Sequence, residues 1–322
     1  MAAYIHIIIL QLYMCNLISL SGQTADCDIA DKNRILCNIE SLTNGNLTIN
    51  TDVETTKTLE VVCKSKEIAK IFPSAIFIHL QNLEHLIIKN CSFFQIGQSA
   101  VKGLKNLTLL VIQGNSNKNR THINENLFES TPKLNYIRMT MKIDQMPRRL
   151  LCSLHHLTIL TLRGNFQYLD AIGCGENNTC CSELNGLHLQ KNKVKKIEGK
   201  DLELPYLQML NLNFNGITEI KLGAFDNLRN LTTLFMNNNK LVEINGNLLE
   251  NIWILEILDL SVNKLIYLPD KIFSHLKSIG KIFLNHNHLF FNQSSKDTFK
   301  GLHSLCGDPK GVHWNISMYH NK

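Results

Sequence analysis

A repeat of about twenty-four residues constrains the fold of this chain more than any other feature. Its template places apolar residues at positions 1, 4 and 6, Asn at position 9, and further apolar residues at positions 11, 14, 19 and 22. Three copies, starting at Leu207, Leu231 and Leu255, follow this template in unbroken register. A single copy cannot bury its apolar face, so successive copies must stack on each other. The sequence therefore predicts a solenoid.

Further copies of the template precede and follow these three. Clear ones span Leu83–Cys91, Leu107–Asn115, Leu157–Asn165, Leu184–Asn192 and Ile279–Asn287. A weaker copy starts at Leu134 and carries Lys142 where Asn is expected, and another starts at Thr56. Because the apolar residues at positions 4 and 6 alternate with polar ones, each copy predicts a short strand with one face inward.

The Asn at position 9 predicts an internal ladder of hydrogen bonds. Its side-chain amide both donates and accepts, so it can satisfy the backbone groups of the turn where the chain leaves each strand. Each such bond is worth roughly 1 kcal/mol. The expected ladder consists of Asn115, Asn165, Asn192, Asn215, Asn239, Asn263 and Asn287.

This pattern resembles the extracellular type of leucine-rich repeat. The resemblance implies an α/β solenoid shaped as a horseshoe, with a parallel sheet on its concave face and irregular or short helical segments on its convex face. We expect an N-terminal cap and a first irregular repeat over residues 23–82, about nine repeats over 83–301, and a non-repeat tail over 302–322.

The first residues predict entry into the secretory pathway. No charged side chain precedes Asp26, and residues 4–20 are almost entirely apolar, so residues 1–22 read as a signal peptide, with a signal anchor as the alternative. Beyond this segment no apolar run is long enough to span a bilayer. Eight N-x-S/T sequons also favour an extracellular glycoprotein, at Asn46, Asn90, Asn106, Asn119, Asn177, Asn230, Asn292 and Asn315. The net charge of +6 alone says little about partners.

The cysteines fall into groups that predict disulfides. Cys27 and Cys37 precede the repeats and are expected to pair within the cap. Cys63 belongs to the cap or to the first repeat, and Cys91 is expected to be a buried free thiol. A second group lies beside the two 27-residue repeats and consists of Cys152, Cys174, Cys180 and Cys181.

In this second group we expect a disulfide from Cys152 to Cys174 or Cys180. Zinc is the alternative, but the adjacent Cys180 and Cys181 and the lack of C-x-x-C pairs argue against a metal site.

The segment MPRRLLCSLHHLTILTLRGN, residues 146–165, carries a closer resemblance. Leu151-Cys152-Ser153-Leu154 enters a repeat and is followed by a cysteine-bearing loop, as in the ectodomains of insect Toll receptors. The resemblance covers roughly residues 83 to 301 and implies recognition of a cytokine-like or microbial protein ligand, or of another leucine-rich repeat receptor chain. A Toll receptor also has a membrane span and a signalling domain. We find no pattern for either here and expect a naturally short secreted relative or a truncated receptor sequence.

The concave face is the expected ligand-binding surface, because its variable residues face outward on a rigid scaffold. Phe235 and Phe283 are candidate anchors, unless they pack on each other. Arg138 and Arg163 could take an acidic partner, although solvated charges are the alternative. The candidate binding residues are Arg138, Arg163, His188, Asn211, Phe235, Asp259 and Phe283.

Two other groups of residues leave alternatives open. The lysines at 191, 193, 195, 196 and 200 could meet phosphates or sulfated glycans, or form a solvated convex loop. His286 and His288 could sense acid, or be ordinary surface histidines.

No motif predicts catalysis. The chain lacks a nucleophile elbow, an H-E-x-x-H pair and a phosphate-binding glycine loop, so we expect no enzyme, no cofactor, no metal and no nucleic-acid partner. The resulting hypothesis is a secreted, extracellular recognition module similar to part of a Toll ectodomain, or a cell-surface one if the chain belongs to a membrane receptor. The alternatives are a secreted structural or adhesive leucine-rich repeat protein, or a soluble decoy.

Overall fold

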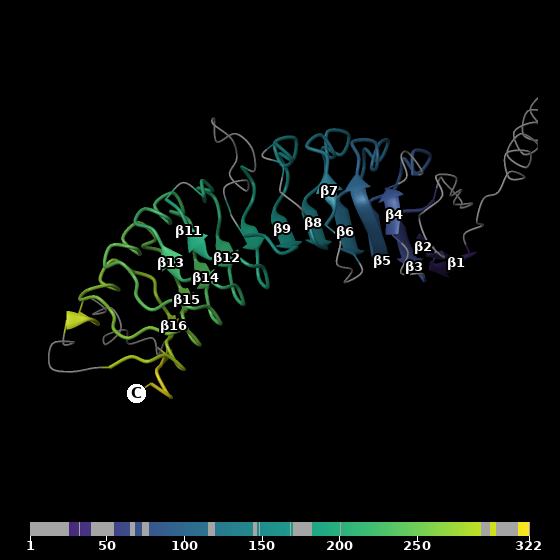
Figure 1. Ribbon diagram of the computed structural model, residues 1–322. Helices are drawn as coiled ribbons and strands as arrows, with labels where there is room; N and C mark the ends of the chain where they lie inside the picture. Colours follow the sequence, from purple (N-terminus) through teal and green to yellow (C-terminus); the bar gives the residue numbers. More distant parts are fainter. Residues whose placement is uncertain are drawn as a thin grey trace, which may run out of the picture.

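A computed structural model describes residues 26–31, 33–39, 55–64, 68–72, 77–114, 120–143, 147, 149–167, 169, 182–199, 201–290, 297–300 and 315–321. The expected signal peptide lies outside these residues. The described part is a curved stack of strands, one for each repeat, that lie side by side from β1 at one end to β16 near the other (Figure 1). The predicted parallel solenoid is confirmed.

One sheet runs through the whole stack in the order β1-β2-β3-β5-β6-β8-β9-β10-β12-β14-β15-β16-β17. Its strands are β1 (Asp26–Asp31), β2 (Arg34–Ile39), β3 (Thr58–Cys63), β5 (His85–Ile96), β6 (Leu109–Gly114), β8 (Tyr136–Thr140), β9 (Ile159–Arg163), β10 (Gly186–His188), β12 (Met209–Asn211), β14 (Thr233–Phe235), β15 (Ile257–Asp259), β16 (Lys281–Phe283) and β17 (Asn315–Ser317). Off this path, β4 (Ile68–Ile71) and β7 (His122–Ile123) pair with β5, and β11 (Lys196–Ile197) pairs with β13 (Glu219–Ile220).

The core follows the repeat template. In the copy that starts at Leu207, the side chains of Leu210, Leu212 and Ile217 are fully buried, and Phe225 at position 19 is 1% exposed. Each copy contributes the same inward set, so the buried side chains of all turns join into one continuous core. At about 25 cal/mol for each Å² of apolar surface, this burial supplies the main favourable term in folding.

The convex side consists of turns. Among the described residues there is no α-helix, so of the irregular or short helical segments expected there the irregular kind is found. Backbone bonds such as Ala224 N to Lys221 O and Leu228 N to Phe225 O are of the i to i+3 kind, which close single turns. Gly223, with φ +82°, sits within the first of them and interrupts helical geometry.

The N-terminal end is covered by the hairpin of β1 and β2, the only antiparallel pairing among the described strands. A disulfide joins Cys27 to Cys37 across this hairpin, as predicted. The hairpin gives β3, the strand of the first repeat, a hydrogen-bonding partner and so covers the edge of the repeats.

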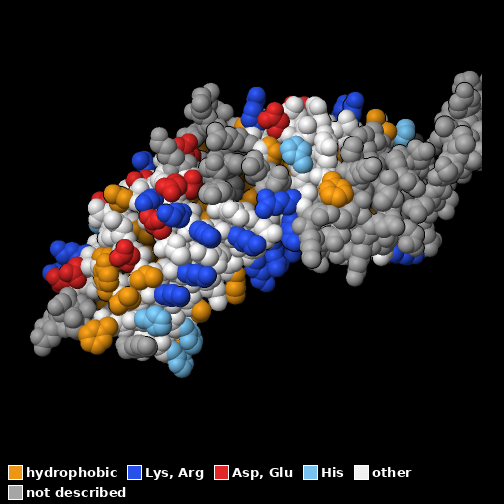
Figure 2. All heavy atoms as spheres, in the orientation of Figure 1, with side chains coloured by type: hydrophobic (Ala, Val, Ile, Leu, Met, Phe, Trp, Pro, Cys, Tyr) orange, Lys and Arg blue, Asp and Glu red, His pale blue; other side chains and the backbone are white. Residues whose placement is uncertain are grey.

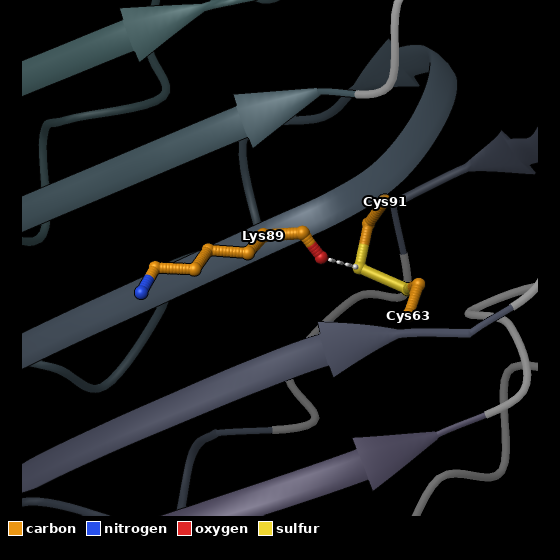
Figure 3. The surroundings of a disulfide bond; sticks show 3 residues. All are labelled: Cys63, Lys89 and Cys91. Carbon is orange, nitrogen blue, oxygen red and sulfur yellow. Dashed lines mark hydrogen bonds between the residues drawn. A yellow bond between two sulfur atoms is a disulfide. The ribbon is translucent and has the colours of Figure 1, made fainter.

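A second disulfide joins Cys63 to Cys91, and it shows that the prediction of a free Cys91 was wrong (Figure 3). The two residues follow the inward positions of adjacent strands, β3 and β5, and both are buried. In Figure 3 the carbonyl oxygen of Lys89 lies 3.3 Å from the Cys91 sulfur. Each repeat forms one turn of the solenoid, so residues about one repeat apart lie beside each other on adjacent strands. Cys63 and Cys91, with a sequence separation of 28, are therefore close enough to form a disulfide.

Cys152 carries a free, half-buried thiol, so its predicted pairing with Cys174 or Cys180 is not made in this structure. Cys174, Cys180 and Cys181 lie outside the described residues.

The segment expected to be a non-repeat tail contains another strand. Residues Asn315–Ser317 pair in parallel with β16, with Ile316 opposite Ile282. Asn321 then bridges to the carbonyl oxygens of Leu284 and Met318, as the position 9 Asn does elsewhere. The prediction that the repeats end at residue 301 was therefore wrong: the spacing to this turn is longer than in the other copies, which hid the shared pattern.

Candidate functional site: the concave face

The Asn side chains at position 9 hold the concave strands in register. The Asn239 amide donates to the carbonyl oxygens of Leu212 and Met236, at 3.0 and 2.9 Å, and accepts from the Ile217 N–H at 3.1 Å. It therefore ties its own turn to the preceding one. The same pattern recurs at Asn192, Asn215, Asn263 and Asn287.

Asn165 does not join this ladder. Its side chain makes no hydrogen bond within the described part of the chain, and its φ is +69°. In the regular turns the left-handed residue stands at position 8, as Asn238 does with φ +56°. In the turn at Asn165 the left-handed conformation occurs one residue later, at position 9. Asn165 therefore takes the place that Asn238 has in its own turn, and it does not act as a ladder residue. Asn115 lies outside the described residues.

The strand pairing brings the candidate binding residues into one column. Arg138 of β8 is opposite Thr161 of β9, and Thr161 is opposite His188 of β10. The column continues in the same way through the position 5 residue of each following strand, which are Asn211, Phe235, Asp259 and Phe283. Arg163 ends β9 in the neighbouring column, opposite Thr140.

The C-terminal half of the column is a polar network between two half-buried rings. Asp259 accepts hydrogen bonds from the Asn237 amide at 2.5 Å and from the Ser261 hydroxyl at 2.6 Å. Phe235 and Phe283 lie on either side of Asp259 in the register, and their rings do not contact each other. The alternative in which the two rings pack together is therefore wrong. Fixed dipoles flanked by aromatic rings are suited to binding a partner without reorganisation.

The middle of the column is basic. The side chains of Arg138 and Arg163 are exposed, and neither forms an ion pair with a described residue. They lie two positions apart on adjacent strands, so two cations face the same space. The neighbouring His188 is half-buried, and this burial lowers its pKa below the usual value. At neutral pH the positive charge of this region thus belongs to the two arginines.

A buried carboxylate continues the column toward the cap. Glu60 lies opposite Ile87 in the register, and its side chain is 7% exposed. It binds Arg34 at 2.7 Å and Lys89 at 2.6 Å. Glu60 was not among the predicted site residues, although the alternation of Leu59 and Val61 in the weak first repeat places residue 60 on the concave face.

Glu60 is expected to make the stability of the cap depend on pH. Its burial opposes ionisation, but the hydrogen bonds from Lys89 and Arg34 together outweigh this effect and lower its pKa below the ordinary 4.5. The ionised group therefore contributes stability that is fully present above about pH 4.5 and is lost as the pH falls through the folded-state pKa.

We expect Glu60→Gln to lower the free energy of unfolding by about 1 kcal/mol at pH 7, with the difference vanishing at acidic pH. Urea unfolding of both proteins between pH 7 and pH 3 measures this, and Glu84→Gln is a control at an exposed ion pair. If the difference in unfolding free energy between the two proteins grew as the pH fell, the predicted direction of the pH dependence would be contradicted.

A hollow of about 390 Å³ lies on the described surface. It is lined by Lys57, Asn82, Glu84, Asn106, Thr108 and Lys133. The Lys57 ammonium lies 2.8 Å from Glu84, and this hydrogen bond lowers the pKa of that carboxyl group. The Thr108 hydroxyl in the same hollow donates to the backbone carbonyl of Glu84 at 3.1 Å, so both polar side chains have partners within the protein.

Other expected features can be placed only in part. Asn90 and Asn230 of the sequons are exposed, and the Asn230 amide donates to the Pro205 carbonyl oxygen at 2.7 Å. The sequons at Asn46, Asn119, Asn177 and Asn292 lie outside the described residues. Within the described ranges no three His, Cys, Asp or Glu side chains gather as a metal site. No helix there is long and apolar enough to cross a bilayer.

Comparison with known families identifies the repeat type. A model of the leucine-rich repeat matches residues 182–241 and 205–265. A model of the BspA type leucine-rich repeat region with six copies matches residues 70–199. Together the matched residues include the strands from β5 to β15 of the concave sheet.

Among curated proteins the chain is similar to keratocans. It is 34% identical to keratocan of Mus musculus over 122 residues, which is 37% of this chain and 34% of that protein. It is 34% identical to keratocan of Bos taurus over 141 residues, or 43% of this chain and 39% of that protein. The matched region thus spans well under half the length of these relatives.

Solved structures share the fold at low sequence identity. The TLR13 chain of a TLR13–ssRNA13 complex superposes with a TM-score of 0.66 at 21% identity, over 78% of this chain and 36% of that one. A chain of the Drosophila Toll–Spatzle complex superposes with a TM-score of 0.57 at 18% identity, over 89% and 44%.

Proposed function

We propose that this leucine-rich repeat protein recognises a protein ligand on its concave face. The observation that carries the proposal is the concave face from Arg138 to Phe283. There Arg138 and Arg163, neither of which forms an ion pair with a described residue, share one face with a satisfied polar network and two separate rings. Such a surface offers aromatic anchors for a partner and positive charges that favour an acidic one, both on a rigid scaffold. The two disulfides favour an extracellular setting.

The ligand class we propose is the one implied by the Toll resemblance, a cytokine-like or microbial protein. The LCSL segment that leads into β9 supports this, and so does the shared fold with a Toll protein solved in complex with Spatzle. A chain of this kind acts by binding, either as part of a receptor or as a soluble decoy.

The second candidate is a secreted structural or adhesive leucine-rich repeat protein. The similarity to keratocans favours it, since these are the curated relatives with 34% identity. Here the concave face would bind another extracellular protein without any effect on Toll signalling.

The concave face can be tested with one double variant. We expect Arg138→Glu with Phe235→Ala to weaken ligand binding by at least tenfold, because central aromatic and Arg residues each contribute about 2 kcal/mol at interfaces. The probe is Drosophila Spatzle, with affinity measured by surface plasmon resonance on the secreted chain. The control, Arg229→Glu with Trp253→Ala, also reverses one Arg charge and removes one large aromatic ring, at exposed positions outside the concave column.

The outcomes separate the proposals. Spatzle binding that only the concave variant loses supports both the surface and the ligand class. Equal binding by all three proteins would contradict the concave site. If Spatzle does not bind and the secreted chain leaves a Spatzle-driven Toll reporter unchanged, the Toll-type ligand is wrong and the adhesive candidate takes its place.

A further inference from the structure

A second outward surface lies where the chain leaves each concave strand. In the five turns that start at Leu184, Leu207, Leu231, Leu255 and Ile279, positions 9 and 11 are the ladder Asn and a buried apolar residue. Positions 8, 10 and 12 alternate with them and face outward. We call these three positions in the five turns the lateral surface. It carries the lysines Lys191, Lys193, Lys195, Lys240 and Lys264.

Backbone hydrogen bonds stack the lateral surface in register. The N–H of Lys240 donates to the Ile217 carbonyl at 2.9 Å, and the N–H of Lys264 donates to the Leu241 carbonyl at 2.8 Å. Each position 10 residue thus follows the previous one at the spacing of adjacent strands, about 4.8 Å. Like charges this close repel each other.

Nothing in the described part of the chain neutralises these lysines. Positions 8, 10 and 12 of the five turns contain no Asp or Glu, and the five lysines form no ion pair with a described residue. Nearby lysines behave differently. Lys196 and Lys221 both bind Glu219, and their hydrogen bonds lower the pKa of that carboxyl group to about 2. The lateral surface therefore keeps its full positive charge.

Apolar side chains border the lysines on both sides. At position 12, Ile266 is 52% and Phe290 63% exposed, and at position 8, Phe214 is 49% exposed. The Lys191 ammonium lies 5.6 Å from the centre of the Phe214 ring. Figure 2 shows Lys and Arg side chains in a row across the turns between β10 and β16, with hydrophobic side chains beside the row. Large apolar groups exposed in a cluster mark a binding surface.

We propose that the lateral surface binds a sulfated polysaccharide. Its sulfate groups would contact the lysine ammonium groups, and the C–H faces of its sugar rings would pack on the exposed aliphatic and aromatic side chains. A linear polyanion relieves the repulsion along the row and releases its counterions, so binding must weaken with salt. The disulfides favour an oxidising, extracellular compartment, where such polysaccharides are available. This site is separate from the concave column.

The test uses the secreted full chain and heparin as the probe. We expect the wild-type protein to stay on a heparin column above about 0.15 M NaCl. The variant Lys240→Gln with Lys264→Gln should bind heparin roughly 2- to 30-fold more weakly. The control variant, Lys102→Gln with Lys105→Gln, removes the same charge from exposed residues in another turn and should elute with the wild type.

A third variant, Ile266→Ser with Phe290→Ser, changes only exposed apolar groups and should also lose affinity for a short heparin oligosaccharide. Release of wild-type protein below physiological salt would overturn the proposal, and so would equal losses in the two lysine variants. If single-stranded RNA of the same charge displaces heparin better than the oligosaccharide does, the ligand is a nucleic acid and the polysaccharide assignment is wrong. Unchanged affinity in the third variant would overturn the packing of sugar rings on the surface.

Discussion

Replacing Cys63 and Cys91 together by Ala lowers the free energy of unfolding by about 3.5 kcal/mol. The disulfide closes a loop with a sequence separation of 28 residues, and the loss of chain entropy on closing a loop of that size accounts for this amount. The bond also connects β3 and β5, the strands of the first two repeats, directly, so its removal loosens the end of the solenoid on which the cap is built. Urea unfolding followed by circular dichroism measures the difference.

A single replacement at Cys152 is the control for this experiment. Its thiol is free and half-buried, so Cys152→Ala is expected to change the free energy of unfolding by less than about 1 kcal/mol. If the double variant at residues 63 and 91 proves as stable as the wild type, the disulfide does not hold the first two repeats together.

The second large effect is expected at the ladder. Asn239→Ala should lower the free energy of unfolding by about 2–4 kcal/mol, because it leaves several buried backbone groups without a partner. These groups are the carbonyls of Leu212 and Met236 and the N–H of Ile217, which an Ala side chain cannot reach. Asn239 itself is 7% exposed, so water does not replace the lost bonds easily.

Asn227→Ala is the matched control for the ladder. This Asn is exposed in a convex turn, and its loss should stay within about 0.5 kcal/mol. Equal losses in the two variants would mean that the ladder bonds contribute no more than a surface amide.

The repeat template predicted the fold because every turn solves the same packing problem. Once Leu207, Leu210 and Leu212 are assigned to the interior, the residues between them must face the concave side. The column from Arg138 to Phe283 followed from this alternation, and the observed strand register agrees with it. What these residues bind does not follow from the alternation, because a scaffold fixes where a side chain stands and not which partner it meets.

The features that the template missed depend on contacts between turns. The Cys63–Cys91 disulfide could be predicted only if the weak first copy were treated as a true repeat. Only then do the two residues lie beside each other on adjacent strands. The buried ion pairs of Glu60 depend on the same turn. The strand at Asn315–Ser317 was missed because the insertion before it breaks the regular spacing, although Ile316 and Asn321 keep the template. Asn165 has the residue type that the template requires at position 9, but its backbone adopts the left-handed conformation that position 8 has in the regular turns.

The most direct test of concave recognition is site-specific photo-crosslinking of the secreted chain. A photoreactive phenylalanine analogue at position 138 or 235 reports on the concave column, and the same analogue at position 229 or 253 reports on exposed residues outside it. The labelled proteins are incubated with Spatzle or with extracellular fluid from the source organism, irradiated and analysed by mass spectrometry. We predict one protein ligand that is crosslinked from positions 138 and 235 alone. Crosslinks to that ligand from positions 229 and 253, with none from the concave positions, would contradict the account.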